Sequence, residues 1–182
     1  DRPGEAEFIF VRGMYRNYQN DGYGYFRGPE GGWWKTDYDA AERNFLRGLK
    51  RYTTMDTNSF SYKTVSLTDS ELFEHTFLYI NMKRIPLRPG NGPNFKPEEA
   101  KALQEFMLRG GFVMLDDFWG PDHWSDFLVE LSKIFPARKL HKLGPSHPIF
   151  HSFFDIDQIA QVPGRAVTWD YGSGFSINDP EY

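Results

Sequence analysis

Apolar residues along this chain recur in two alternating patterns, short continuous runs and longer stretches with helical spacing. The runs predict buried strands, and they lie at residues 7–11, 62–67, 76–82 and 112–115. The stretches with an apolar residue every three or four positions predict amphipathic helices, and they lie at residues 38–52, 97–107 and 124–135. Strands that alternate with helices predict an α/β domain with a mainly parallel central sheet and helices on both faces.

Residues that favour caps and turns stand at the ends of these predicted elements. Thr68 and Glu71 have the spacing of a capping box and predict a short helix that continues through Phe73. Pro97 suits the first turn of a helix, and Gly110 suits the position just past a helix end. These residues therefore mark where each predicted helix begins or ends.

The periodic pattern weakens after the last predicted helix. Residues 139–143 are a further strand candidate, and residues 147–156 predict a turn with one or two short helical turns. Residues 162–182 lack helical spacing and predict an irregular C-terminal segment of loop and edge strand. We therefore expect one α/β domain over residues 1–182, with a central sheet of four to six strands.

The longest stretch without apolar periodicity, residues 13–36, is rich in aromatic residues and glycine. Loops of this length inside a compact domain are usually functional or disordered. Aromatic rings with polar edges favour contact with a carbohydrate or a protein, and Arg12, Arg16 and Arg27 offer planar donors for a carboxylate or a sugar acid. The residues expected to make contacts are Tyr15, Arg16, Tyr18, Tyr23, Tyr25, Phe26, Trp33 and Trp34. The alternative is that the loop folds over the sheet and completes the core.

Composition excludes several classes of function. A formal net charge of -4, with lysine and arginine scattered along the chain, offers no basic surface for nucleic acid. No apolar run has the roughly 18 residues that a membrane-spanning helix needs, so any membrane contact is expected through partners. The chain has no cysteine, which excludes disulfides, a thiolate nucleophile and cysteine-ligated metal.

Two adjacent carboxylates follow the apolar run at residues 112–115. Asp116 and Asp117 are expected at the carboxyl end of a buried strand, where open α/β sheets bind ligands. Neighbouring side chains on a strand point to opposite faces, so one carboxylate can face the crevice while the other caps the next helix. Asp116, Asp117 and the nearby His123 are therefore candidates for acid–base catalysis, and ordinary helix capping is the alternative.

Histidine spacing raises the question of a metal site. His147 and His151 are four residues apart, which places two imidazoles on one face of a helix and suits a divalent metal. Asp155 lies one further turn along, and His123 is a candidate additional ligand. The aromatic residues around the two histidines favour another interpretation, a packed turn whose histidines hydrogen-bond to the backbone. The main expectation is a chain without a cofactor, and a divalent metal is the alternative.

The stretches GGFVMLDDFWG, HPIFHSFFDI and GGWWKTDYDAAERNF resemble the bacterial family known as domain of unknown function 4159, and the likeness runs from about residue 8 to about residue 162. This resemblance implies the flavodoxin-like α/β fold of class I glutamine amidotransferases. In active enzymes of that fold, the strand corresponding to residues 112–115 leads into a turn with a cysteine nucleophile. Asp116, Asp117 and Phe118 stand there instead, so glutaminase activity is excluded. The family is often exported in Gram-negative bacteria, which implies a periplasmic location after removal of a signal peptide.

Two functional hypotheses follow from the sequence. The first is a non-catalytic interaction domain, an accessory or structural subunit of a periplasmic or envelope-associated protein assembly, in which residues 13–36 contact the protein partner. The second is a hydrolase or carbohydrate-binding enzyme that uses Asp116 or Asp117 with His123 or His147, with a divalent metal as an option. The missing nucleophile and the surplus of aromatic residues outside the helical stripes favour the first.

Overall fold

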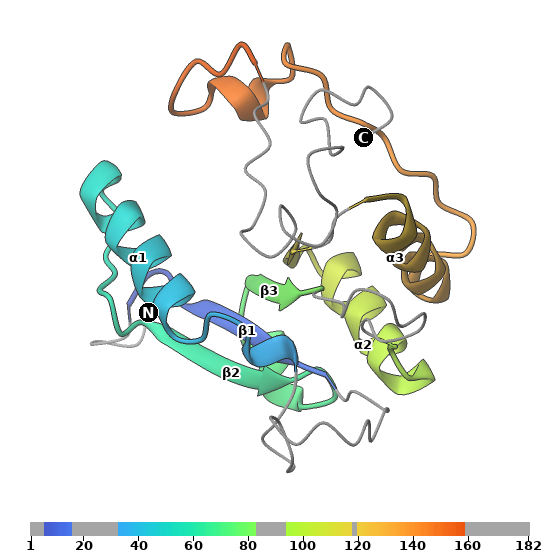
Figure 1. Ribbon diagram of the computed structural model, residues 1–182. Coiled ribbons are helices and arrows are strands. Elements are labelled where there is room, and N and C mark those ends of the chain that lie inside the picture. The colour runs from blue at the N-terminus through green and yellow to red at the C-terminus, as the bar shows by residue number, and fades with distance from the viewer. Residues whose placement is uncertain (1–5, 16–32, 83–93, 118–119, 159–182) are drawn as a thin grey trace. The chain divides into compact units, whose positions relative to one another are not determined.

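The computed structural model describes residues 6–15, 33–82, 94–117 and 120–158 of the 182-residue chain, the side chains of residues 33 and 120–122 excepted (Figure 1). Residues 1–135 and residues 136–182 form two compact units. The sheet and the α-helices lie in the first unit, and the described part of the second unit contains one short helix.

A parallel sheet forms the centre of the first unit. Its strands are β1 (Phe10–Met14), β2 (Tyr62–Ser66), β3 (Phe77–Asn81) and β4 (Phe112–Asp116). Their spatial order is β2-β1-β3-β4, and every neighbouring pair is parallel. Because this is the strand order of a flavodoxin-like sheet, the predicted α/β fold class is confirmed.

The described residues form both α-helices and short 3-10 helices. The α-helices are α1 (Ala40–Tyr52), α2 (Pro97–Leu108) and α3 (Gly120–Ile134), and the 3-10 helices are η1 (Trp33–Lys35), η2 (Ser70–Glu74) and η3 (Pro148–His151). Within the described ranges, no helix combines the length and the apolar character that crossing a membrane requires.

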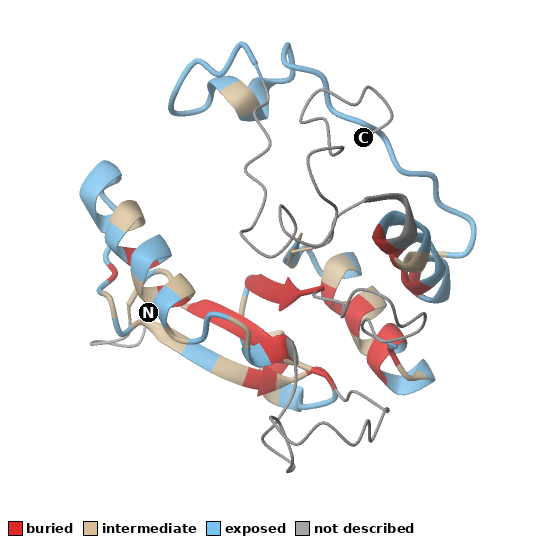
Figure 2. Ribbon diagram, in the orientation of Figure 1, coloured by how far each residue is buried: buried red, intermediate tan, exposed pale blue. Residues whose placement is uncertain are grey.

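The sheet separates two apolar clusters because alternate side chains of a strand point to opposite faces. On one face, Leu78 and Ile80 of β3 are buried with apolar residues of α2 and α3. On the other face, Phe77 and Tyr79 of β3 are buried with Leu46 of α1. Figure 2 shows the buried residues concentrated in β1, in β3 and on one side of α2. The helices therefore cover both faces, as predicted.

Local hydrogen bonds explain where α2 begins and ends. The Glu99 carboxylate accepts a hydrogen bond from the backbone N–H of Lys96, 2.9 Å away, and Pro97 follows as the first helical residue. At the other end, Gly110 has a φ of 95°, and the N–H groups of Gly110 and Gly111 donate to carbonyls of the last helical turn. This is a Schellman motif, and it confirms that Gly110 ends the helix.

Two predicted boundaries were wrong for physical reasons. β1 runs from Phe10 to Met14, three residues later than predicted, because Arg12 and Gly13 lie inside the strand. A Cβ on Gly13 would lie 2.9 Å from Leu67 Cδ2, so glycine permits close packing there. At η2, the cap is Asp69 rather than Thr68, since the Asp69 side chain accepts from the N–H of Glu71.

The end of the first unit and the start of the second also depart from expectation. The predicted buried strand at residues 112–115 is present as β4, but its side chains alternate between exposed and partly buried. Phe112 and Met114 are 57% and 37% exposed, because no described strand lies beyond β4 and no described helix buries this face. The strand predicted at residues 139–143 is absent; that stretch is irregular and exposed.

Candidate functional site

The carboxyl edge of the sheet brings together polar residues from three strands. The register pairs Asn81, the last residue of β3, with Asp116, the last residue of β4. Tyr15 directly follows β1, and Asp117 directly follows β4. In sheets of this order, the chain connections diverge between β1 and β3, and ligands bind at that edge. These four residues define the candidate site, which we name the carboxyl-edge site.

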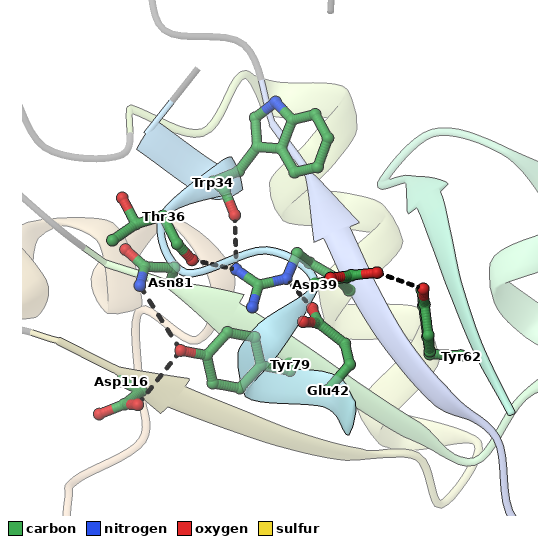
Figure 3. A network of polar contacts seen from close by, with 9 residues as sticks. Trp34, Thr36, Asp39, Glu42, Tyr62, Tyr79, Asn81 and Asp116 are labelled. Atoms are coloured by element: carbon green, nitrogen blue, oxygen red, sulfur yellow. Dashed lines mark hydrogen bonds and ion pairs between the residues drawn. The ribbon is translucent and has the colours of Figure 1, made fainter. Parts of the chain in front are cut away.

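Hydrogen bonds link the side chains of the carboxyl-edge site. The hydroxyl of Tyr15 donates to the backbone carbonyl of Asn81 at 2.7 Å, and the hydroxyl of Tyr79 donates to Asp116 Oδ2 at 3.1 Å. The Asn81 amide makes two longer contacts, 3.4 Å to Asp117 Oδ2 and 3.5 Å to the Tyr79 hydroxyl oxygen. Figure 3 shows Asn81, Tyr79 and Asp116 in this chain of contacts. The prediction that Asp116 and Asp117 end a strand at this edge is confirmed.

Asp117 has an unusual backbone conformation. Its φ is 65°, in the left-handed region that non-glycine residues rarely adopt. The backbone N–H of Asp117 donates to Asp116 Oδ1 at 2.7 Å, which ties the two residues together at the turn between β4 and α3. Asp116 is exposed and Asp117 is partly buried. Strained backbone of this kind concentrates at functional sites, so the turn is a reasonable place for ligand contact.

The two phenols of the site remain protonated. Burial raises the pKa of Tyr15 well above its ordinary value; the Arg12 guanidinium opposes this effect, and the Asp117 carboxylate adds to it. Burial likewise raises the pKa of Tyr79, and the Asp116 carboxylate raises it further. Both hydroxyls therefore act as hydrogen-bond donors rather than as bases.

Behind the site, Arg12 forms the most connected polar group on the α1 face. Its side chain is fully buried, and its Nε donates to the Glu42 carboxylate in the first turn of α1. Its Nη1 donates to the backbone carbonyls of Trp34 and Thr36, at 2.7 and 3.0 Å. The guanidinium also lies 4.7 Å from the centre of the Tyr79 ring. Arg12 thus fixes η1 and the start of α1 against the centre of the sheet.

These contacts decide the role of several residues predicted to lie on a contact surface. Arg12 was predicted to offer its donors to a ligand, and this was wrong because the side chain is fully buried and its Nε and Nη1 donate to Glu42 and to backbone carbonyls. Tyr15 and Trp34 are 3% and 6% exposed and belong to the core. The residues that lie outside the described ranges are Arg16, Tyr18, Tyr23, Tyr25, Phe26 and Arg27. Trp33 opens η1, and its side chain is among those not described.

A second polar contact secures the start of α1. The hydroxyl of Tyr62 on β2 donates to Asp39 Oδ2 at 2.6 Å, and Asp39 also pairs with Arg43 at 2.9 Å. The hydrogen bond from Tyr62 lowers the pKa of Asp39, and the same bond raises the pKa of Tyr62. The carboxylate is therefore favoured in its charged form beside the first turn of α1.

The histidines predicted as ligands make local contacts. His147 Nδ1 accepts from the N–H of Ile149 at 3.2 Å and caps η3. His151 lies 2.8 Å from the Pro145 carbonyl and 3.1 Å from Asp155 Oδ1. These contacts match the part of the packed-turn interpretation in which the histidines bond to the backbone. The turn itself is not packed, because Ile149, Phe153 and Phe154 are 52%, 56% and 61% exposed. In the portion of the chain that is described, no three His, Asp or Glu side chains are grouped to hold a metal ion.

His123, the remaining candidate, lies near the start of α3 and is 6% exposed. Sequence reasoning missed Tyr79, Asn81 and Glu42. A charged residue inside an apolar strand was the available signal for the last of these, because a buried Arg12 requires a buried anion nearby. No comparable signal marks Tyr79 or Asn81, which lie within an apolar run that predicts a strand and nothing more.

Comparison with known protein families gives one finding. The family model described as "domain of unknown function" (DUF4159) matches residues 22–179, which is most of the chain. The match includes α1, the last three strands of the sheet and the carboxylates of the carboxyl-edge site. No curated protein matches the chain.

Proposed function

The chain belongs to the DUF4159 family, whose description names no activity, and we propose a function from the geometry of the carboxyl-edge site. The protein is a non-catalytic interaction domain that acts as an accessory or structural subunit of a periplasmic or envelope-associated protein assembly. Its contact residues are those of the aromatic-glycine loop between the buried residues Tyr15 and Trp34, a stretch that follows β1 in the chain.

The observation that carries this proposal is the anchoring of both ends of the loop. Tyr15 is buried at the start of the loop and bonds to Asn81 on β3. Trp34 is buried near the end of the loop, and its carbonyl accepts from Arg12 on β1. The described residues on either side of residues 16–32 are therefore both held against the sheet. Loops that carry recognition residues are typically held in this way on a rigid scaffold.

Composition of the loop supports contact with a protein. Between the two anchors, the sequence places five aromatic residues, namely Tyr18, Tyr23, Tyr25, Phe26 and Trp33. Aromatic rings are enriched among the residues that supply most of the binding energy at protein interfaces. The chain also lacks the cysteine that amidotransferase chemistry requires, which removes the known reaction of the implied fold.

The test compares the native size of the unmodified protein with that of loop variants, after gentle extraction from the source cells. Tyr23→Ser, Tyr25→Ser and Phe26→Ser combined should release the chain from its assembly, so that it migrates near its 21.3 kDa mass. The matched control is Phe60→Ser, since Phe60 is 71% exposed and lies outside the loop. Trp34 is avoided because its replacement would disturb the core. A loop variant that stays in the assembly, or a wild-type monomer, contradicts the proposal.

A second function has one specific observation in its favour. Asp116, Asp117, Asn81 and Tyr79 converge at the ligand-binding edge of the fold, and Asp117 has a strained backbone. This arrangement suits a hydrolase or a carbohydrate-binding enzyme that uses a carboxylate together with His123. Asp116→Asn combined with Asp117→Asn should then abolish turnover of a glycoside or ester panel, with and without added divalent metal, and leave the assembly intact. Turnover that survives both substitutions contradicts this alternative.

A further inference from the structure

The α1 face of the sheet is unevenly covered. On this face, the ring of Phe77 on β3 lies 5.8 Å from that of Phe45 on α1 and 5.9 Å from that of Phe112 on β4, stacked in both cases. Phe77, at the centre of this row, is 9% exposed, whereas Phe45 and Phe112 at its two ends are 38% and 57% exposed. Met114, two residues along β4, is 37% exposed on the same side. The aromatic row is therefore buried at its centre and exposed at both ends.

The opposite face of β4 is covered. Val113 and Leu115 point to that side and pack against the cluster that includes residues of α2 and α3. Strands of a parallel sheet are normally buried on both faces, because helices lie on each side of the sheet. Contiguous exposed apolar residues on an otherwise polar surface usually mark an interaction site. Among the described residues, no helix covers this side of β4, where this architecture normally has one.

α1 carries a glycine in its interior, on the same side of the helix as Phe45. Gly48 lies one turn from Phe45 and one turn from Tyr52, and a Cβ built on it would meet no atom within 4 Å. Glycine destabilises a helix interior relative to alanine, and no neighbour within the described unit requires its small size. The small size of Gly48 would allow the backbone of a second helix to pack closely against α1 at this position.

Charges at the two ends of this surface favour a helix of one polarity. Asp116 and Asp117 lie at the carboxyl edge of β4, and Lys50 and Arg51 lie in the last turn of α1. Because α1 returns the chain toward the amino end of β2, its last turn lies at the opposite end of the sheet. A helix that runs in the same direction as α1 would place its positive amino end near the carboxylates. Its negative carboxyl end would lie toward the two cations.

We propose that the surface formed by Phe112, Met114, Phe45 and Gly48 is the docking site for an amphipathic helix of a partner protein, lying beside α1 and parallel to it. β4 spans about 17 Å, which a helix of about 11 residues covers, and α1 has 13 residues, so a helix of similar length reaches its last turn. None of these residues belongs to the aromatic-glycine loop, and the inference does not depend on the function proposed for that loop.

The probe is a hydrocarbon-stapled, 18-residue helical peptide with neutral ends, a leucine stripe facing one side, and a fluorescent label. Its binding to the full-length chain is measured by fluorescence anisotropy. We expect saturable binding, weakened at least about tenfold by Met114→Glu, which puts a charge on the apolar surface. Gly48→Leu should weaken binding to a similar extent while preserving α1, because leucine favours a helix and the space at this position is open. Val129→Glu, at a 56% exposed position of α3, is the matched control and should leave binding unchanged.

Polarity is tested with a nitroxide on either end of the same peptide. A label on the first residue should broaden the amide signals of Asp116 and Asp117, and a label on the last residue should broaden those of Lys50 and Arg51. The reverse pattern, or a probe that binds no better than a peptide with a scrambled apolar stripe, overturns the inference. It is also overturned if the free chain forms a dimer that Met114→Glu dissociates. If the amides of residues 112–114 are strongly protected from hydrogen exchange in the free monomer, another part of the same chain covers this surface. That result overturns the inference as well.

Discussion

Arg12 and Asp116 lie on the same face of the sheet, on strands separated by β3, and Tyr79 of β3 contacts both of them. Arg12 is fully buried, and its donors serve Glu42 and two backbone carbonyls. Asp116 is exposed at the carboxyl edge, and it accepts from Tyr79 and from the backbone of the next residue. The difference is one of solvent access, and it separates a charge used to hold the fold from a charge placed where a ligand can reach it.

Among the variants that test this comparison, the largest effect is expected from removing the Glu42 carboxylate that pairs with the buried Arg12. Glu42→Leu leaves the Arg12 guanidinium buried without its carboxylate, and it should lower the free energy of unfolding by about 3–5 kcal/mol. Urea unfolding measures the loss. Combining it with Arg12→Met should recover part of the loss, because no charge then remains buried. Glu98→Ala, at an exposed position, is the control and should change stability by less than about 0.5 kcal/mol. A loss of that small size for Glu42→Leu would show that the pair is not needed.

The backbone of Asp117 tests the other side of the comparison. Asp117→Val places a β-branched residue at a φ of 65° and should destabilise the chain by about 1–2 kcal/mol. Asp117→Gly relieves the strain and should leave stability unchanged or slightly higher, although it also removes the carboxylate. Thermal and urea unfolding of the two variants give the comparison. Equal stabilities for valine and glycine would contradict a left-handed conformation at this residue.

Tyr79 connects the two charged groups, and its hydroxyl can be removed alone. Tyr79→Phe keeps the ring beside Arg12 and deletes the hydrogen bond to Asp116. We expect a loss of about 0.5–1.5 kcal/mol in the free energy of unfolding. Tyr52→Phe, at a 50% exposed position on α1, is the matched control. If both variants lose the same amount, the hydroxyl of Tyr79 has no special part in joining the two regions.

The next prediction concerns a smaller effect, the dependence of stability on pH that arises from the ionisable side chain of His75. The His75 side chain is 9% exposed; burial and, next, the nearby Lys63 lower its pKa below 6.5, and Glu71 opposes them from 3.8 Å. The unfolded chain therefore takes up a proton first as pH falls. Stability should be constant above about pH 6.5 and should fall below it. Urea unfolding at pH 7.5, 6.5 and 5.5 measures this decline.

Substituting the histidine separates its contribution from that of the carboxylates. His75→Gln should flatten the decline between pH 7.5 and 5.5, since the titrating group is gone. His141→Gln, at an exposed position of the second unit, should leave the decline unchanged. A decline that persists in His75→Gln would assign it to other groups.

The sequence predicted the elements well wherever their apolar spacing was regular. The periods of α1, α2 and α3 and the runs of β2 and β3 placed these elements within a few residues of their ends, because burial of one face fixes the spacing. β1 was misplaced because Arg12 reads as a polar stop, and its partner Glu42 lies 30 residues away. Local pattern carries no information about a pairing at that distance.

Part of the candidate site could also be predicted from the apolar pattern. Asp116 and Asp117 stand directly after an apolar run, so their position at the carboxyl edge followed from the pattern. Tyr15 and Trp34 were assigned to a contact surface and are buried, because an aromatic ring suits a core and an interface equally. Which of the two it joins depends on tertiary contacts, here those with Phe95 and Tyr38.

The hydrogen bonds from Arg12 to the end of the loop have a consequence for how the sequence of this protein can evolve. Nη1 binds the main-chain oxygens of residues 34 and 36, and every amino acid provides such an oxygen. The two hydrogen bonds therefore fix the main chain at residues 34 and 36 and place no demand on the side chains of these residues. Substitutions at these two positions can accordingly alter the side chain without removing either bond to Arg12.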